Sequence, residues 1–149
     1  MIAVIQRVSQ ASVEINGALK EQISRGFLIL LGIANNDSEE DVYWLCKKIA
    51  AMRIFNDAEG KMNLGLKEIN GSILLISQFT LHANTKKGNR PSFLDAARPE
   101  QAIPLYEKLI KGLEAELGQT IKTGEFGADM KVSLINDGPV TIIVDSKNK

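Results

Sequence analysis

The chain has 149 residues, the size of one domain, which can bury about 68–70% of the surface that its unfolded form exposes. Lysine and arginine together number 18, as do aspartate and glutamate, so the net charge is zero and a generally basic nucleic-acid binder is excluded. The longest apolar run, Phe27 to Ala34, is too short to span a bilayer, and the single Cys46 excludes an intramolecular disulfide. Residues 1–8 carry no charged leader and are expected to form a strand, not a signal peptide.

Strand and turn signals alternate over the next part of the chain. Asn16-Gly17 separates two β-prone segments, 11–15 and 18–23. Asn-Gly between such segments predicts a hairpin, because both turn positions need a positive φ. Gly26 then precedes an apolar run, 27–33, that is typical of a buried strand.

A first helix is predicted after Asn36-Asp37. Ser38 with Asp41 three residues later resembles a capping box, with Asp in place of the usual Glu or Gln. The apolar side chains recur at helical spacing on one face, at Val42, Leu45, Cys46 and Ile49. Cys46 is therefore interpreted as a small buried residue and not as a nucleophile.

The middle of the chain combines an apolar strand with a polar end. Segments 64–69 and 72–81, joined by Asn70-Gly71, are predicted to form a second hairpin, and 52–55 another short strand. If the strand runs to Leu81, alternation places Ser77 and Phe79 on one face and Gln78, Thr80 and His82 on the other. Either this end simply runs out into solvent, or it holds hydrogen-bonding groups for a ligand. A basic loop, with Lys86, Lys87, Arg90 and Arg98, follows and favours an anionic ligand.

A second helix and further strands complete the predicted fold. An apolar stripe begins near Pro99 and ends at Gly118, and Pro104 predicts either a kink or a later start. Strands are predicted at 120–122, 130–135 and 140–144, and the polar tail 145–149 is expected to fray. We therefore predict one α+β domain over 1–149, with a mostly antiparallel, curved or barrel-like sheet and two main helices.

Two loops near the end of the chain need a further explanation. In 123–130, Gly124 and Gly127 flank Phe126, which either packs into the core or belongs to a loop where glycine leaves room for a ligand. Asn136-Asp137-Gly138-Pro139 joins two predicted strands. Spacing alone predicts an ordinary turn there, since cis bonds are the minority even before proline.

The residue inventory limits the chemistry. His82 and Cys46 are the only histidine and cysteine, two ligands where a zinc site of the usual kind needs three or four. No P-loop and no complete dinucleotide-binding fingerprint is present. We expect neither a metal nor a cofactor.

Several segments together resemble the D-aminoacyl-tRNA deacylase family. They are SQFTL at 77–81, TKKGNRPS at 85–92, GEFGADM at 124–130, NDGPVT at 136–141 and, at the first strand, VIQRV at 4–8. Each motif alone is weak, but the four motifs from 77 to 141, in the family's order and at the expected length, are specific. The resemblance extends from Met1 to about Val144.

The resemblance implies a cytoplasmic homodimer that hydrolyses the ester between a D-amino acid and the terminal adenosine of tRNA, and that also removes glycine from mischarged tRNA. Its partners would be tRNA and a second copy of the chain, with no membrane or DNA. The active sites would lie at the subunit interface, where Gly138-Pro139 of one subunit, with a cis bond, enters the pocket of the other for chiral selection.

The resemblance also implies roles for individual residues. The catalytic group would be Ser77, Gln78, Phe79 and Thr80. Substrate contacts would come from Phe126, Gly127, Ala128, Met130 and Arg7, and phosphate contacts from Lys86, Lys87 and Arg90. Arg7 would alternatively brace the Gly138-Pro139 loop or form a plain surface ion pair.

Three mechanisms and two other functions stay open at the level of sequence. Thr80 could attack the ester with His82 as base, or Ser77 could do so, although its spacing to His82 is odd. In the third mechanism the 2′-hydroxyl of the terminal adenosine helps to activate water, and backbone N–H groups near Phe79 and Thr80 stabilise the oxyanion. The alternative functions are a non-catalytic module that binds the tRNA 3′ end, and a dimeric scaffold without a ligand.

Overall fold

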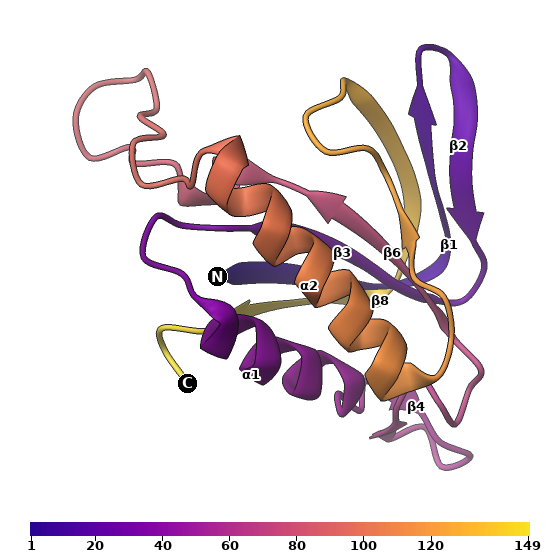
Figure 1. Cartoon of the computed structure of the whole chain (residues 1–149). Helices are drawn as coiled ribbons and strands as arrows, with labels where there is room; N and C mark the ends of the chain where they lie inside the picture. The colour runs from indigo at the N-terminus through magenta and orange to yellow at the C-terminus, as the bar shows by residue number, and fades with distance from the viewer.

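A computed structural model describes all residues, 1–149, as one α+β domain with a strongly curved, nearly closed sheet (Figure 1). The long strand β1 (Ile2–Ile15) lies at its centre. Its three antiparallel neighbours are β2 (Ala18–Ile23), β3 (Gly26–Gly32) and β8 (Met130–Asp145). Because β1 bends, its first half pairs with β3 and its second half with β2, while β8 follows it along nearly its whole length.

The other side of β3 carries the parallel part of the sheet. Strand β6 (Ser72–Ser77) pairs with β3, and the short β7 (Lys122–Thr123) pairs with β6. Strands β4 (Phe55–Asn56) and β5 (Met62–Leu64) form a separate two-stranded hairpin. The sheet is thus mixed, with an antiparallel majority.

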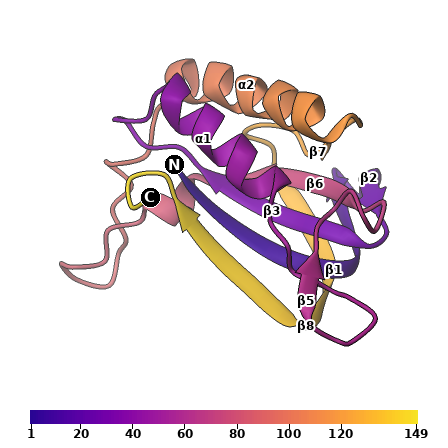
Figure 2. The ribbon, with the colours of Figure 1, turned by 90° about the horizontal axis from the view of Figure 1, so that it is seen from below.

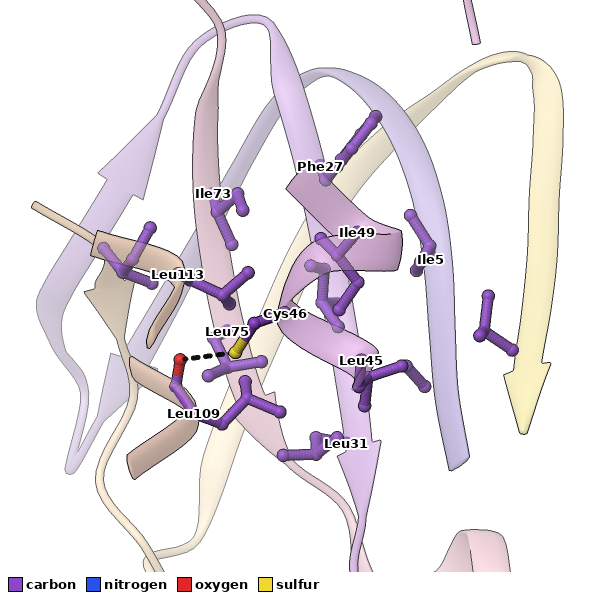
Figure 3. Packing of buried hydrophobic residues seen from close by; sticks show 14 of the residues in the cluster. Ile5, Phe27, Leu31, Leu45, Cys46, Ile49, Ile73, Leu75, Leu109 and Leu113 are labelled. Atoms are coloured by element: carbon purple, nitrogen blue, oxygen red, sulfur yellow. Dashed lines mark hydrogen bonds between the residues drawn. The ribbon is translucent and has the colours of Figure 1, made fainter. Parts of the chain in front are cut away.

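Two helices pack on one side of this sheet (Figure 2). They are α1 (Glu39–Ala50) and α2 (Pro99–Leu117). At their crossing Cys46 Sγ lies 3.5 Å from the carbonyl oxygen of Leu109, surrounded by apolar side chains from both helices and the sheet (Figure 3). A Cβ added at Gly112 would lie 2.6 Å from this sulfur, so the glycine permits the close approach. None of the helices is both long and apolar enough to cross a membrane.

Several sequence predictions are confirmed. Asn16 and Gly17 both have positive φ in the turn between β1 and β2. The Ser38 N–H donates to the Asp41 carboxylate at 2.8 Å, as expected of a capping box. Helix α2 begins at Pro99, as the apolar stripe indicated, and not at a later residue, as Pro104 would also have allowed.

Two predictions on local structure are wrong. Segments 64–69 and 72–81 do not form a hairpin, since β6 pairs in parallel with β3 and residues 66–70 form turns. The tail does not fray at its start, because Ser146 is 1% exposed and Lys147 donates to Asp41 at 2.7 Å.

Candidate functional site

A mostly apolar cavity of about 310 Å³ lies beyond the end of β6. The 77–79 segment and the 126–130 loop, far apart in sequence, form two of its walls. The candidate site residues that line it are Ser77, Gln78, Phe79, Phe126, Gly127, Ala128 and Met130. The structure therefore brings together two of the segments that sequence analysis singled out.

The polar wall of the cavity is set by the end of β6. The strand stops at Ser77, and a 3₁₀ turn, η1 (Phe79–His82), follows it. The Gln78 N–H donates to the Leu31 carbonyl at 2.7 Å, and its side-chain amide donates to Thr80 Oγ1 at 2.6 Å. The first N–H groups of a helical turn have no partner within it, so those of Phe79 and Thr80 remain available to a ligand.

The expected strand alternation through His82 is wrong, because this 3₁₀ turn replaces it. Thr80 does not line the cavity, and its hydroxyl is engaged by Gln78. His82 Nε2 is buried without a hydrogen-bond partner, so no imidazole assists Thr80 or Ser77. The geometry gives no support to either nucleophile–histidine pair.

The loop 124–130 forms another wall of the cavity. The interpretation of Phe126 as a residue that packs into the core is confirmed, whereas room for a ligand beside the glycines stays a prediction. The Phe126 ring meets Tyr106 edge to face at 5.8 Å and packs against the core, while it also lines the cavity. A Cβ at Gly124 would lie 2.3 Å from Met130 Sδ, so this glycine leaves space for the methionine that lines the cavity.

Two buried titratable side chains, Tyr106 beside Phe126 and Cys46 at the crossing of the helices, are structural. Burial raises the pKa of Tyr106 well above its ordinary value, and its hydroxyl donates to the Leu75 carbonyl at 3.1 Å. Burial, with a smaller effect of Glu116, raises the pKa of Cys46 to about 11. The thiol therefore stays protonated and does not act as a nucleophile.

The basic loop projects from the body beside η1 (Figure 1). Asn84 and Ser92 pair at its base through two backbone hydrogen bonds of 2.7 and 2.9 Å. Lys86, Lys87 and Arg90 are exposed, and none of them forms an ion pair with an acidic side chain. Three unneutralised cations on one projection suit an anionic partner.

The segment 137–140, called the tip from here on, departs from the β1–β8 ladder. Asn136 pairs with Val8 and Thr141 with Gln6, so four residues of β8 stand opposite Arg7 alone. The Gly138–Pro139 bond is cis, as the family resemblance implied and as spacing alone did not. The tip does not line the cavity of its own chain.

Arg7 braces the tip. Its side chain is buried, and it donates to the carbonyl oxygens of Asp137 and Ile54 at 2.9 and 2.6 Å. The Arg7–Asp137 ion pair, at 3.7 Å, is looser. Arg7 is therefore no plain surface residue, and it does not line the cavity.

Sequence analysis missed part of the cavity wall. Leu31, Ile33, Ala97 and Ala102 line it, and Phe93 meets Phe79 edge to face at 5.1 Å beside it. These are ordinary apolar residues on separate elements, and no local pattern distinguishes them from the core.

Comparisons with known proteins identify the family. A family model described as D-Tyr-tRNA(Tyr) deacylase matches residues 4–145. The chain is 65% identical to a D-aminoacyl-tRNA deacylase of Cytophaga hutchinsonii and 62% identical to one of Bacteroides fragilis, with 100% of this chain and 99% of each relative covered. The chain belongs to the D-aminoacyl-tRNA deacylase family.

Solved structures share the fold of this chain. A c-Myc DNA Unwinding Element Binding Protein superposes with a TM-score of 0.92 at 39% identity, over 97% of this chain and 98% of that one. A probable eukaryotic D-amino acid tRNA deacylase shares the fold, with a TM-score of 0.80 at 17% identity over 96% and 97% of the two chains. As a D-aminoacyl-tRNA deacylase, the protein is an ester hydrolase.

Proposed function

We propose that this deacylase hydrolyses the ester of D-aminoacyl-tRNA, and of glycine mischarged on tRNA, in the cytoplasm, and rejects L-aminoacyl-tRNA. The observation that carries the proposal is the cavity itself. It joins the polar end of β6 to the glycine-flanked Phe126 loop in a chain of this family. An apolar cavity with a few polar groups at one wall suits a small acyl group joined to a nucleoside.

Chiral rejection follows from how D- and L-aminoacyl groups differ. They differ only in the direction of the side chain from Cα, so an enzyme that accepts many D-amino acids has to recognise the chiral centre itself. The backbone of Gly138 and Pro139 offers carbonyl groups without a long side chain, on a tip that Arg7 holds. An L side chain would meet this rigid backbone, whereas glycine has no side chain to exclude.

The chemistry needs little catalytic machinery. An aminoacyl ester is already labile, so positioning and stabilisation of the oxyanion suffice. The N–H groups of Phe79 and Thr80 would supply that stabilisation, and the 2′-hydroxyl of the terminal adenosine would help to activate water. Thr80 then acts through its backbone and through the Gln78 contact, and not as a nucleophile.

The tip is proposed to act in a homodimer. Within one chain it does not reach the cavity, so a second copy would have to supply it. Ile135 and Ile143 on β8 are 52% and 70% exposed, which leaves apolar side chains on the strand that carries the tip. Burial of these side chains against the other copy would favour association.

The tRNA would approach along the basic loop. Lys86, Lys87 and Arg90 would contact phosphates, which gives affinity that is independent of sequence and sensitive to salt. Phe79 is 56% exposed and stands edge to face with Phe93, so it also offers an aromatic face to a nucleobase.

Mixing two inactive variants tests the shared site. Ala128→Trp fills the cavity, and Gly138→Val is strained because Gly138 has φ +141° and a Cβ there would lie 2.9 Å from Val140 N. Each variant alone should fail to release D-tyrosine from D-Tyr-tRNA. If each site combines the cavity of one subunit with the tip of the other, an equal mixture recovers about a quarter of wild-type activity. No recovery after subunit exchange would contradict the shared site, and a wild-type chain that binds tRNA without turnover would indicate a binding module.

A further inference from the structure

The tip leaves β8 through a narrow neck. On β8, Asn136 is the last residue before the tip that pairs with β1, and Thr141 is the first residue after the tip that does so. Asp137–Val140 lie between them. Neither residue at the centre of the tip fixes its own direction. Gly138 has the widest backbone freedom, and Pro139 has no N–H to donate. The orientation of the tip therefore depends on groups at its neck.

Asn136 closes this neck with its side chain. Its Oδ1 accepts the Val140 N–H at 2.9 Å, and its Nδ2 donates to Thr141 Oγ1 at 2.9 Å. The same Thr141 oxygen accepts from Gln6 Nε2 of β1 at 3.4 Å. One half-buried amide thus links the outgoing end of the tip to the strand before it and, through Thr141, to β1.

Arg7 holds the other end. Its Nε donates to the Asp137 carbonyl, so the incoming residue of the tip is fixed by Arg7 and the outgoing residue by Asn136. The two contacts lie on opposite sides of Gly138-Pro139. Loss of either would let the backbone between them rotate, while the ladder on both sides of the neck stays paired.

We propose that Asn136 is a positioning residue that determines stereospecificity, acting on the Gly138-Pro139 backbone through Val140 and Thr141. This inference rests on the proposed function and deepens it. Asn136 would not touch the substrate. It would keep the tip at the position where an L side chain is excluded, so its loss would raise the rate on L-aminoacyl-tRNA more than it lowers the rate on D-aminoacyl-tRNA.

The test compares kcat/KM for D-Tyr-tRNA and L-Tyr-tRNA in four variants. Asn136→Ala removes both hydrogen bonds. Asn136→Asp keeps an acceptor for the Val140 N–H, and its second oxygen accepts from the Thr141 hydroxyl. Thr141→Val removes only the hydroxyl, and Thr141→Ser retains it. We expect the D-to-L ratio to fall at least about tenfold in Asn136→Ala, equivalent to ~1.4 kcal/mol, and to recover in Asn136→Asp.

The outcomes separate the inference from a purely structural role. If Asn136→Ala changes kcat/KM by the same factor for D-Tyr-tRNA and L-Tyr-tRNA, so that the D-to-L ratio is unchanged, the inference is overturned. If Asn136→Ala does not fold, the comparison of Thr141→Val with Thr141→Ser decides, since only the former should lower the ratio. A wild-type chain that fails to hydrolyse D-Tyr-tRNA would refute the proposed function and the inference with it. If the wild type and Asn136→Ala both prefer D-Tyr-tRNA over L-Tyr-tRNA to the same degree, the inference alone is refuted.

Discussion

Replacement of Arg7 by methionine should lower the free energy of unfolding by more than a typical single substitution does. Arg7 is 7% exposed and donates from Nε to the Asp137 carbonyl at 2.9 Å and from Nη1 to the Ile54 carbonyl at 2.6 Å. Methionine fills much of the volume but donates no hydrogen bond. Hydrogen bonds to charged groups contribute ~1.5–3 kcal/mol each, and the Asp137 side is open to water, so we expect a loss of about 2–4 kcal/mol in total.

Urea unfolding of the wild type and of Arg7→Met measures this loss of stability. The chain also provides a matched control. Arg53 also donates through its Nε to a carbonyl at 2.9 Å, that of Asn63, but both residues are exposed. Arg53→Met should therefore change the free energy of unfolding by less than about 0.5 kcal/mol. Because Arg7 also holds the tip, Arg7→Met should lower the D-to-L ratio. Equal effects of the two substitutions on stability would refute the reasoning from burial.

Three further predictions concern the mechanism, the tRNA contact and the pH dependence. Thr80→Ala loses one exposed hydrogen bond with Gln78 and should lower kcat by less than about tenfold, whereas a loss of several orders of magnitude would restore Thr80 as a nucleophile. Replacing Lys86, Lys87 and Arg90 together by alanine should raise KM. It should also reduce the slope of log affinity against log salt concentration by about 2, since each phosphate contact contributes about 0.7 to that slope. Lys61→Ala, on the β4–β5 hairpin, is the control and should change neither KM nor the slope. Burial would raise the pKa of Asp41, but hydrogen bonds from Lys147 and Ser146 and from the Ser38 N–H outweigh it and hold that pKa well below its ordinary value. A carboxyl with a lowered pKa stabilises the folded state at pH values above its pKa in the unfolded chain, about 3.9. Asp41→Asn should therefore have a lower free energy of unfolding than the wild type at pH 7, and this difference should shrink as the pH falls below about 4. A deficit that does not depend on pH would exclude this ionic contribution.

Local signals predicted the local parts of the fold. Asn16-Gly17 forms the hairpin turn and Ser38 caps α1, because each feature depends on residues a few positions apart. Asn70-Gly71 also turns, with Asn70 at φ 50°, but the strand that follows pairs with β3 and not with the segment before it. An apolar run indicates a buried strand and does not specify its neighbours, so this pairing was mispredicted.

In the candidate site, too, local sequence signals predicted some residues but not those that depend on tertiary packing. The polar end of β6 and the glycines around Phe126 could be recognised because residue type and position were unusual for a strand end and a loop. Ala97 and Ala102 could not, since small apolar residues become a cavity wall only when α2 and the segment before it pack over β6. The 3₁₀ turn at 79–82 was missed because strand alternation was extended past Ser77, and the histidine pairing failed with it.

The most direct test of the account is the rate at which the wild-type protein releases tyrosine from D-Tyr-tRNA and from L-Tyr-tRNA under identical conditions. Rapid release of D-tyrosine with almost no release of L-tyrosine is the predicted result. Similar rates on both substrates would contradict chiral selection by the Gly138-Pro139 backbone, and release from neither, with tRNA still bound, would contradict the deacylase itself.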